Sequence, residues 1–303
     1  MSKLLGSGDF TYELVKGWGA LPDGWSLGPT GVATDSQDRV YLANRSAHPL
    51  VVLDSDGAFL KACGEGVVTS PHGIFIDSND HLYLPQLHAH TVLKCDIEGN
   101  VLMTMGKVNV ASNPDWSGEL KQYLQSPPPA SYGPFCGPTD VALAPDGAIY
   151  VSDGYGNASI HRFTSGGTLI GTFGRPGSLS PGAFHTPHGI WVAQDGRVFV
   201  ADRENHRLQI FSPEGEFLAQ WTGFESPCDI FIDTRNIVYV AEGGGALMTD
   251  AMVSILSIDG EFLTRWKGPA GAPGHAIWVD TKGCIYVNQI LEGQRILKFQ
   301  PIA

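Results

Sequence analysis

The sequence predicts an all-β fold, a six-bladed β-propeller in one domain over residues 1–303. Three observations predict it. A pattern of apolar runs joined by tight turns recurs six times, roughly every forty to fifty residues, a period typical of propeller blades. The 38 glycines and 20 prolines are spread along the whole chain, which suits many short strands better than disorder. The last repeat lacks a fourth strand, and the N-terminus contains a matching one.

The segment Thr186–Phe211 shows the repeated unit most clearly. Two runs rich in β-branched and aromatic residues flank Asp195-Gly196, which is a strong hairpin signal. A third run, Leu208–Phe211, follows a polar bend, and a turn at Glu214-Gly215 leads into a fourth, Phe217–Trp221. The segment therefore predicts one four-stranded antiparallel blade.

The other five units align with this one at the residues that open the first strand. They start at Gly28, Ser70, Cys136, Ser226 and Ala272. The sixth unit stops after a third strand at Arg295–Phe299, while Phe10–Gly19 resembles the fourth strands of units four and five. We expect the N-terminal strand to complete the last blade, because closing the ring removes exposed strand edges.

Two segments depart from the repeat. Lys107–Phe135 is a long insertion between units two and three, and Ala241–Met252 is an expanded loop in unit five. Long loops in compact domains are usually functional or disordered. We expect the insertion to lie on the active-site face as a lid or pocket wall.

Composition excludes several classes of partner. The net charge of −12 argues against a nucleic-acid surface, and no apolar run is long enough to span a membrane. The N-terminus shows no apolar signal core. The five cysteines form no C-x-x-C pair, which favours reduced thiols in a cytoplasmic protein. The oligomeric state stays open.

One position of the repeat points to a metal site. It directly precedes the first strand, where the chain rings the propeller axis. In chain order it holds Thr30, His72, Thr139, His188, Cys228 and His275. Histidine thus falls on alternate blades, so three imidazoles should converge on the axis. A lone histidine is usually solvated or hydrogen-bonded, but three neutral imidazoles with an open position are a common catalytic zinc arrangement. Iron, cobalt and manganese fit imidazole as well.

Positions after the second strand of three units predict a substrate site at the same end of the ring. They hold Arg45, Tyr155 and Arg203. Arginine binds carboxylates through a bidentate fork, and a phenol near a cation can act as a general base. For Arg203 the alternative is an ion pair with Asp202 or Glu204.

Other polar residues near these positions are expected to be structural or without a role. Asp153, Asp202 and Asn157 should bond backbone groups in the blade bends, and Cys228 should be a buried thiol. The repeat supports no role for the remaining candidates on this face, which are His48, His88, His90, His185 and Glu204.

Several motifs resemble those of a known family. They are P-H-G-I at Pro71 and Pro187, F-C-G-P-T-D-V-A at Phe135, V-S-D-G-Y-G-N at Val151 and V-A-D-R-E-N-H-R-L-Q at Val200. These segments resemble NHL-repeat propellers and, more narrowly, the peptidyl-α-hydroxyglycine α-amidating lyases. The resemblance covers all six blades, and its specific part is the D-G-Y and A-D-R-E-N segments.

The resemblance implies an activity and a role for each candidate residue. It implies that His72, His188 and His275 bind zinc, that Tyr155 is the base, and that Arg45 and Arg203 flank the substrate. The family reaction cleaves the C–N bond of an N-acyl-α-hydroxyglycine to an amide and glyoxylate. A bound metal suits this chemistry because it acidifies the substrate hydroxyl.

The chain also departs from the family pattern. Ala276 stands where the family has an aspartate for a structural calcium, so bound calcium is doubtful although the carbonyls of Val32 and Ile74 could remain. Gly156 replaces the family's disulfide partner of Cys136, and the methionine before the third histidine is missing. We therefore expect a cytoplasmic enzyme whose partner is a small carboxylated metabolite.

Two alternatives remain beside the metal-dependent lyase. A metal-dependent hydrolase or hydratase would use the same centre with metal-bound hydroxide as the nucleophile. A non-catalytic NHL interaction module would use the propeller as a binding surface, although such modules often carry basic surfaces and this chain is acidic.

Overall fold

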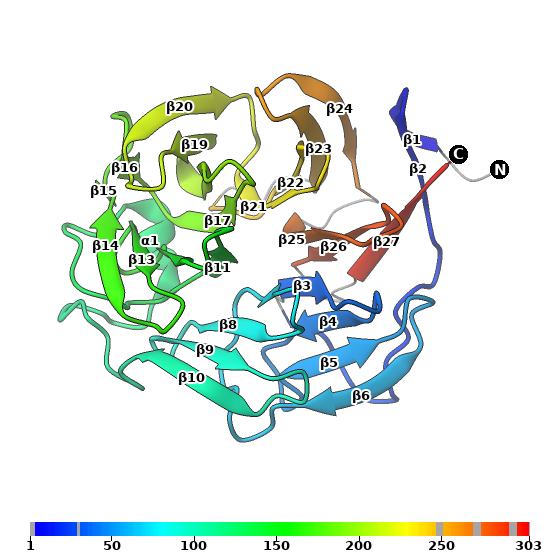
Figure 1. The fold of residues 1–303 in the computed structure, drawn as a ribbon, viewed down its shortest axis with the longest axis horizontal. Coiled ribbons are helices and arrows are strands. Elements are labelled where there is room, and N and C mark those ends of the chain that lie inside the picture. Colours follow the sequence, from blue (N-terminus) through cyan, green and yellow to red (C-terminus); the bar gives the residue numbers. More distant parts are fainter. Residues whose placement is uncertain (1–3, 29–30, 247–250, 269–273, 291–295, 303) are drawn as a thin grey trace.

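The computed structural model describes residues 4–28, 31–246, 251–268, 274–290 and 296–302. The predicted six-bladed propeller is confirmed: six antiparallel sheets lie around a central axis, in chain order around the ring (Figure 1). Five sheets have four strands, and the sheet of blade six has five.

The first three blades span the N-terminal half of the chain. Blade one consists of β3 (Gly31–Thr34), β4 (Val40–Ala43), β5 (Leu50–Leu53) and β6 (Phe59–Cys63). Blade two consists of β7 (Phe75–Ile76), β8 (Leu82–Gln86), β9 (Thr91–Cys95) and β10 (Val101–Gly106). Blade three follows the helix α1 (Leu120–Gln125) and consists of β11 (Asp140–Leu143), β12 (Ile149–Asp153), β13 (Ser159–Phe163) and β14 (Leu169–Phe173).

The last three blades complete the ring. A short parallel pair, β15 (Arg175–Pro176) and β16 (Ala183–Phe184), precedes blade four, which consists of β17 (Pro187–Val192), β18 (Val198–Asp202), β19 (Arg207–Phe211) and β20 (Phe217–Thr222). Blade five consists of β21 (Pro227–Ile232), β22 (Ile237–Glu242), β23 (Met252–Ser257) and β24 (Phe262–Lys267). Blade six consists of β25 (Gly274–Val279), β26 (Ile285–Gln289), β27 (Ile296–Pro301), β2 (Phe10–Leu14) and β1 (Leu4–Ser7).

The position of a strand within its blade determines its burial. All residues of the second and third strands of blade four, β18 and β19, are buried, because they pack against neighbouring blades on both faces. The outer strand β20 alternates between intermediate and exposed residues, as a strand with one solvated face does. The core is therefore a set of apolar layers between blades rather than one central cluster.

The ring closes as predicted, with one addition. β2 pairs antiparallel with β27, so that Leu14 lies opposite Phe299. β2 ends earlier than the predicted strand Phe10–Gly19, and the predicted start of the third strand, Arg295, lies outside the described residues. The sequence did not predict β1, which pairs with β2 as a fifth strand.

A buried side-chain acceptor recurs at the end of the second strand in five blades. Its oxygen accepts a backbone N–H from the segment that leads into the first strand of the same blade. The pairs are Asn44 with Gly28, Gln86 with Thr69 and Ser70, Asp153 with Cys136, Asp202 with His185, and Glu242 with Glu225. These bonds fix the entry into the first strand, and they confirm the structural prediction for Asp153 and Asp202.

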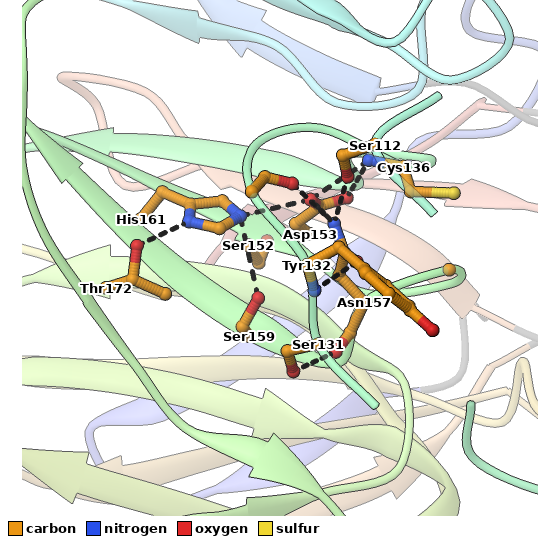
Figure 2. Close-up of polar contacts among 12 residues, drawn as sticks. Ser112, Ser131, Tyr132, Cys136, Ser152, Asp153, Asn157, Ser159, His161 and Thr172 are labelled. Carbon is orange, nitrogen blue, oxygen red and sulfur yellow. Dashed lines mark hydrogen bonds and ion pairs between the residues drawn. The ribbon is translucent and has the colours of Figure 1, made fainter. Parts of the chain in front are cut away.

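The acceptor of blade three is the centre of a larger network (Figure 2). Besides Cys136, Asp153 accepts hydrogen bonds from the Asn157 amide at 2.6 Å and from the His161 ring at 3.1 Å. Asn157 also accepts from the Tyr132 backbone N–H, so the predicted structural role of Asn157 is confirmed and the insertion is tied to blade three.

The described residues include all five cysteines, and each is a free thiol. A Cβ placed on Gly156 would lie 2.1 Å from the Cys136 sulfur, so the position that faces this thiol is occupied by glycine. Within the described part of the chain, no helix has the length and apolar character needed to cross a membrane.

Ring closure makes a testable contribution to stability. Tyr12 of β2 is 3% exposed and stacks on Trp266 of blade five at 5.4 Å. We predict that Tyr12→Ala lowers the free energy of unfolding by about 3–5 kcal/mol, as is usual for a buried aromatic residue. Urea unfolding followed by fluorescence measures the effect. Leu4→Ala, at a position 59% exposed, is the control and should change little; similar losses for both variants would contradict the prediction.

Candidate active site

The structure brings the three predicted histidines together on the propeller axis. The candidate ligand nitrogens of His72, His188 and His275 all lie within 4.8 Å of one another. The ring centroids are 4.7 to 4.9 Å apart, and each residue is 3% exposed or less. The three histidines therefore converge from alternate blades, as expected from the repeat. Thr30, the blade-one residue at this position, lies outside the described residues.

Neighbouring blades fix the tautomer of two of these imidazoles. The Nδ1–H of His72 donates to the Thr139 carbonyl at 2.8 Å, and that of His188 donates to the Cys228 carbonyl at 2.7 Å. A carbonyl only accepts, so Nδ1 carries the proton and Nε2 keeps its lone pair. The Nε2 of His188 is buried and has no hydrogen-bond partner within the described part of the chain.

The electrostatic environment keeps these imidazoles neutral. Burial lowers the pKa of His72 and of His188 well below the ordinary value, and the nearby Arg203 and the other histidines lower it further. A neutral imidazole, whose Nε2 carries a lone pair instead of a proton, is the form that binds a metal. The residues present therefore fit a transition metal held by three nitrogens, with room for a further ligand.

Tyr155 lies beside this cluster. Its O–H donates to the Nε2 of His72 at 3.2 Å, and its ring meets the His72 ring edge to face. The D-G-Y motif has a steric basis, because a Cβ on Gly154 would lie 2.1 Å from the Pro187 carbonyl oxygen. The network around Asp153 holds the turn that carries the tyrosine.

Arg203 lies on the other side of the Tyr155 ring. It begins the short 3-10 helix η1 (Arg203–Asn205) that follows β18, and its guanidinium carbon is 5.7 Å from the Tyr155 ring centroid. Its Nε donates to Glu204 at 2.9 Å, so the alternative ion pair exists, but with Glu204 rather than with Asp202. Asp202 pairs with Arg207 instead. Burial opposes the charge of Arg203, but Tyr155, Cys228 and Glu204 raise its pKa overall.

Arg45 follows β4 and is partly buried at the same end of the ring. Burial lowers its pKa, and the nearby Tyr155 opposes that effect. The positive charge of Arg45 in turn lowers the pKa of His72 and His88. The predicted cation thus lies within electrostatic range of both Tyr155 and the histidine cluster.

The four histidines for which the repeat gave no role are outside the cluster. His48 stacks on Trp25, and His90 accepts the Gly137 N–H at 3.2 Å. His185 donates to the Tyr123 carbonyl at 2.9 Å, and His88 is exposed at a position near Arg45. Among the described residues, only the three ring histidines form a group of potential metal ligands.

The insertion at 107–135 contacts the residues that flank the cluster. Its α1 carries Tyr123, on which Trp116 stacks at 5.3 Å. A Cβ on Gly137 would touch both Trp116 and Tyr155, so both of these side chains lie close to Gly137. Of the blade-five loop, residues 247–250 lie outside the described residues, as does Pro273 before the third histidine.

Two carboxylates in the central channel are features that our sequence reasoning missed. Asp140 and Asp229 line a cavity of about 20 Å³ next to the histidines, enough for one water-sized group. Each accepts backbone N–H groups, including Ile190 for Asp140 and Ile277 for Asp229. The signal was visible in the repeat, since units three and five have aspartate where the others have glycine or alanine.

These aspartates share one environment. Burial raises the pKa of both, that of Asp229 to about 7, and the charge of Asp229 raises that of Asp140 further. Two carboxyl groups in hydrogen-bond contact in a channel favour holding one proton between them. Ala276 has no carboxylate, which made a bound calcium ion doubtful from the sequence. Asp140 and Asp229 supply carboxylates to the same channel from other blades.

Comparisons with known proteins agree with this architecture. The NHL repeat family model matches residues 135–163 and 184–211. The chain is thus a six-bladed β-propeller with NHL repeats in blades three and four. Its fold resembles that of a streptogramin B lyase, with a TM-score of 0.62 at 16% identity over 96% of this chain and 88% of the other. At that identity the similarity shows the fold alone.

Two relatives extend the comparison to sequence. A probable peptidyl-alpha-hydroxyglycine alpha-amidating lyase of Caenorhabditis elegans is 34% identical over 55% of this propeller and 50% of its own length. NHL repeat-containing protein 3 of Homo sapiens is 27% identical over 96% of the propeller and 84% of its own length. The propeller thus resembles the amidating lyases, and it spans half the length of the Caenorhabditis relative.

The aspartate pair predicts a pH dependence of stability. The pKa of these groups is raised on folding, so the folded state binds more protons, and stability present near pH 4 is lost as the pH rises through about 7. We predict that the free energy of unfolding falls by up to about 1.4 kcal/mol per pH unit in this range, and that Asp229→Asn removes most of the slope.

Denaturant unfolding from pH 5 to 8 tests the aspartate pair. Asp56→Asn, at an exposed turn, is the control and should keep the wild-type slope. A rise in Tm on addition of calcium, seen in the wild type and lost in Asp229→Asn, would contradict a shared proton in the channel.

The histidine cluster predicts metal binding. We expect protein purified from a metal-replete culture to carry about one transition metal ion per chain. His188→Ala should weaken zinc binding by more than about 100-fold, because only two of three nitrogens remain. Elemental analysis and competitive zinc titration measure this. The control His81→Gln, whose side chain pairs with Asp77, should bind as the wild type does; equal metal content in all three proteins would exclude the cluster as the site.

Proposed function

We propose that the propeller is a metal-dependent lyase that cleaves the C–N bond of an N-acyl-α-hydroxyglycine-like carbinolamide. The products are an amide and an α-oxo acid such as glyoxylate. One observation carries the proposal: the Tyr155 O–H lies 3.2 Å from the Nε2 of His72, within a cluster of three buried imidazoles. The name of the Caenorhabditis relative supports the same reaction class.

His72, His188 and His275 would hold the metal, zinc or another divalent transition ion. When bound, such an ion polarises a substrate oxygen and makes its proton more acidic. The hydrogen bonds from Nδ1 to Thr139 and Cys228 orient two of the rings and raise their basicity as ligands. Burial keeps the imidazoles neutral, so protons do not compete for Nε2 near neutral pH.

Tyr155 acts as the general base in this proposal. Its oxygen removes the proton of the α-hydroxyl, the C–O bond becomes a carbonyl, and the electron pair of the C–N bond moves to the amide nitrogen. The phenol then returns the proton to that nitrogen, so no co-reactant is needed. The guanidinium of Arg203 lies over the tyrosine ring, 5.7 Å from its centroid, and so holds a positive charge next to the proposed base.

The two arginines select a carboxylated substrate. Arg45 and Arg203 lie at the same end of the ring as the histidines and influence them electrostatically. A guanidinium binds a carboxylate through two parallel hydrogen bonds, which would orient the α-carbon toward Tyr155. The insertion, through Trp116 beside Gly137, would limit the size of the acyl group and exclude water.

We also propose that the enzyme acts on a small metabolite in the cytoplasm. Five free cysteines and Gly156 opposite Cys136 support a reducing compartment. The net charge of −12 supports the absence of a nucleic-acid partner.

A non-catalytic interaction module is the second candidate. The human relative that aligns with 96% of this chain is named only for its NHL repeats, which favours this alternative. A binding module, however, needs no cluster of buried neutral imidazoles beside a tyrosine and an arginine, since such groups cost stability unless they serve a site.

An activity assay tests the lyase. We predict that zinc-loaded protein converts an N-acyl-α-hydroxyglycine to amide and glyoxylate in equal amounts. Tyr155→Phe should lower kcat by about 100-fold or more at unchanged metal content, because it removes only the base. Tyr132→Phe, at a half-buried tyrosine of the insertion, is the control and should keep its activity.

The outcome also separates the alternatives. Incorporation of labelled oxygen from water into a new carboxylate would indicate a hydrolase instead of a lyase. Full biological function of a Tyr155→Phe, Arg203→Lys double variant would favour the interaction module and contradict the proposal.

A further inference from the structure

Glu204 is a buried carboxylate at the candidate active site for which the repeat gave no role. Its side chain is 5% exposed, and that of its partner Arg203 is 4% exposed. We propose that Glu204 is a positioning residue that fixes the guanidinium of Arg203 and anchors the blade-five loop beside the substrate pocket. The inference rests on the proposed lyase function and assigns a residue to the same site.

Both oxygens of Glu204 are occupied by groups from different blades. One accepts from the Nε of Arg203 at 2.9 Å, within blade four. The other accepts from the backbone N–H of Ala246 at 3.0 Å, in the loop that follows β22 of blade five. A single carboxylate therefore connects a site arginine to the neighbouring blade.

The glycines of the blade-five loop make room for this contact. A Cβ on Gly245 would lie 3.1 Å from the second Glu204 oxygen and 2.7 Å from the Ser226 hydroxyl. A Cβ on Gly244 would lie 2.9 Å from the sulfur of Cys228. The run Gly243–Gly245 and Glu204 thus form one packed unit, which explains why this loop departs from the repeat.

The contact at Nε determines what Arg203 can still do. With Nε held by Glu204, the guanidinium carbon lies 5.7 Å from the Tyr155 ring centroid, so the terminal Nη groups lie near that ring. The carboxylate also compensates the charge of Arg203, so the guanidinium contributes directed hydrogen bonds more than net charge. Without Glu204, the arginine would be free to rotate about its side-chain bonds and would leave an uncompensated charge beside the histidines.

Other buried acid–arginine pairs nearby serve the fold. Glu242 pairs with Arg265 at 2.6 Å and accepts hydrogen bonds from the Glu225 backbone N–H and the Ser254 hydroxyl, so these contacts all lie within blade five or its entry segment. In the described part of the chain, the Glu204 side chain accepts from Arg203 and from Ala246 of blade five, and not from the entry segment of its own blade. Glu242 is therefore a matched control for burial and charge.

The test compares Glu204→Gln and Glu204→Ala with Glu242→Gln in zinc-loaded protein. A glutamine oxygen can accept from Arg203 or from Ala246 but not from both, because its amide nitrogen is a donor. We expect kcat/KM to fall by about 10-fold or more in both Glu204 variants. Most of this loss should appear as a higher KM, because Arg203 binds the substrate carboxylate in the proposed site.

Hydrogen exchange gives a second readout that needs no turnover. Amides 243–246 should exchange about 10-fold faster in Glu204→Ala, because the loop loses its anchor. Glu242→Gln should leave KM unchanged even where its stability falls. A wild-type KM in the Glu204 variants, with wild-type exchange at 243–246, would overturn the inference.

Binding of N-acetylglycine, measured by calorimetry, separates failure of this inference from failure of the proposed function. This carboxylate lacks the α-hydroxyl and is not cleaved. Binding to the wild type that weakens at least about 5-fold in Glu204→Ala supports the inference. Equal binding to both contradicts it. If the wild type does not bind N-acetylglycine, the proposed substrate class fails, and the hydrogen exchange at 243–246 still decides whether Glu204 anchors the loop.

Discussion

The hydrogen bond from a ring histidine to a carbonyl of the next blade is the interaction on which the candidate site depends. His72 donates to Thr139 and His188 donates to Cys228, and each bond fixes the tautomer and the direction of its ring. The Nε2 lone pairs of the ring histidines converge on the axis only while adjacent blades keep their register. Any change that moves one blade against the next would therefore disturb the candidate metal ligands before it unfolds the chain.

The blades keep that register through buried polar side chains. In five blades an oxygen at the end of the second strand accepts a backbone N–H at the entry to the first, as Asp202 does from His185. Glycines allow the close approach that follows, as at Gly154 beneath the Pro187 carbonyl. The candidate site residues are attached to these same turns. The turns that stabilise the fold therefore also position the candidate site.

The repeat made most of the fold and part of the site predictable. A histidine at one repeat position on alternate blades must converge on the axis, and this geometry requires no knowledge of packing. Asp140, Asp229 and Glu204 were not placed, because each has a hydrogen-bond partner in the next blade. Their contacts depend on which neighbours have a glycine at the facing position, as at Gly245. The strand β1 was missed because its short run resembles no other unit.

The pairing of β2 with β27 also has a consequence for how the molecule forms. Tyr12 lies opposite Pro301, so the last sheet contains residues from both ends of the chain. During synthesis the earlier blades can form in order, but the ring stays open until β27 at 296–301 pairs with β2. Such a long-range contact is slow to form. Until it forms, two unpaired edges are accessible, and an edge is where one chain can pair with another. Closure is thus the step at which folding and self-association compete.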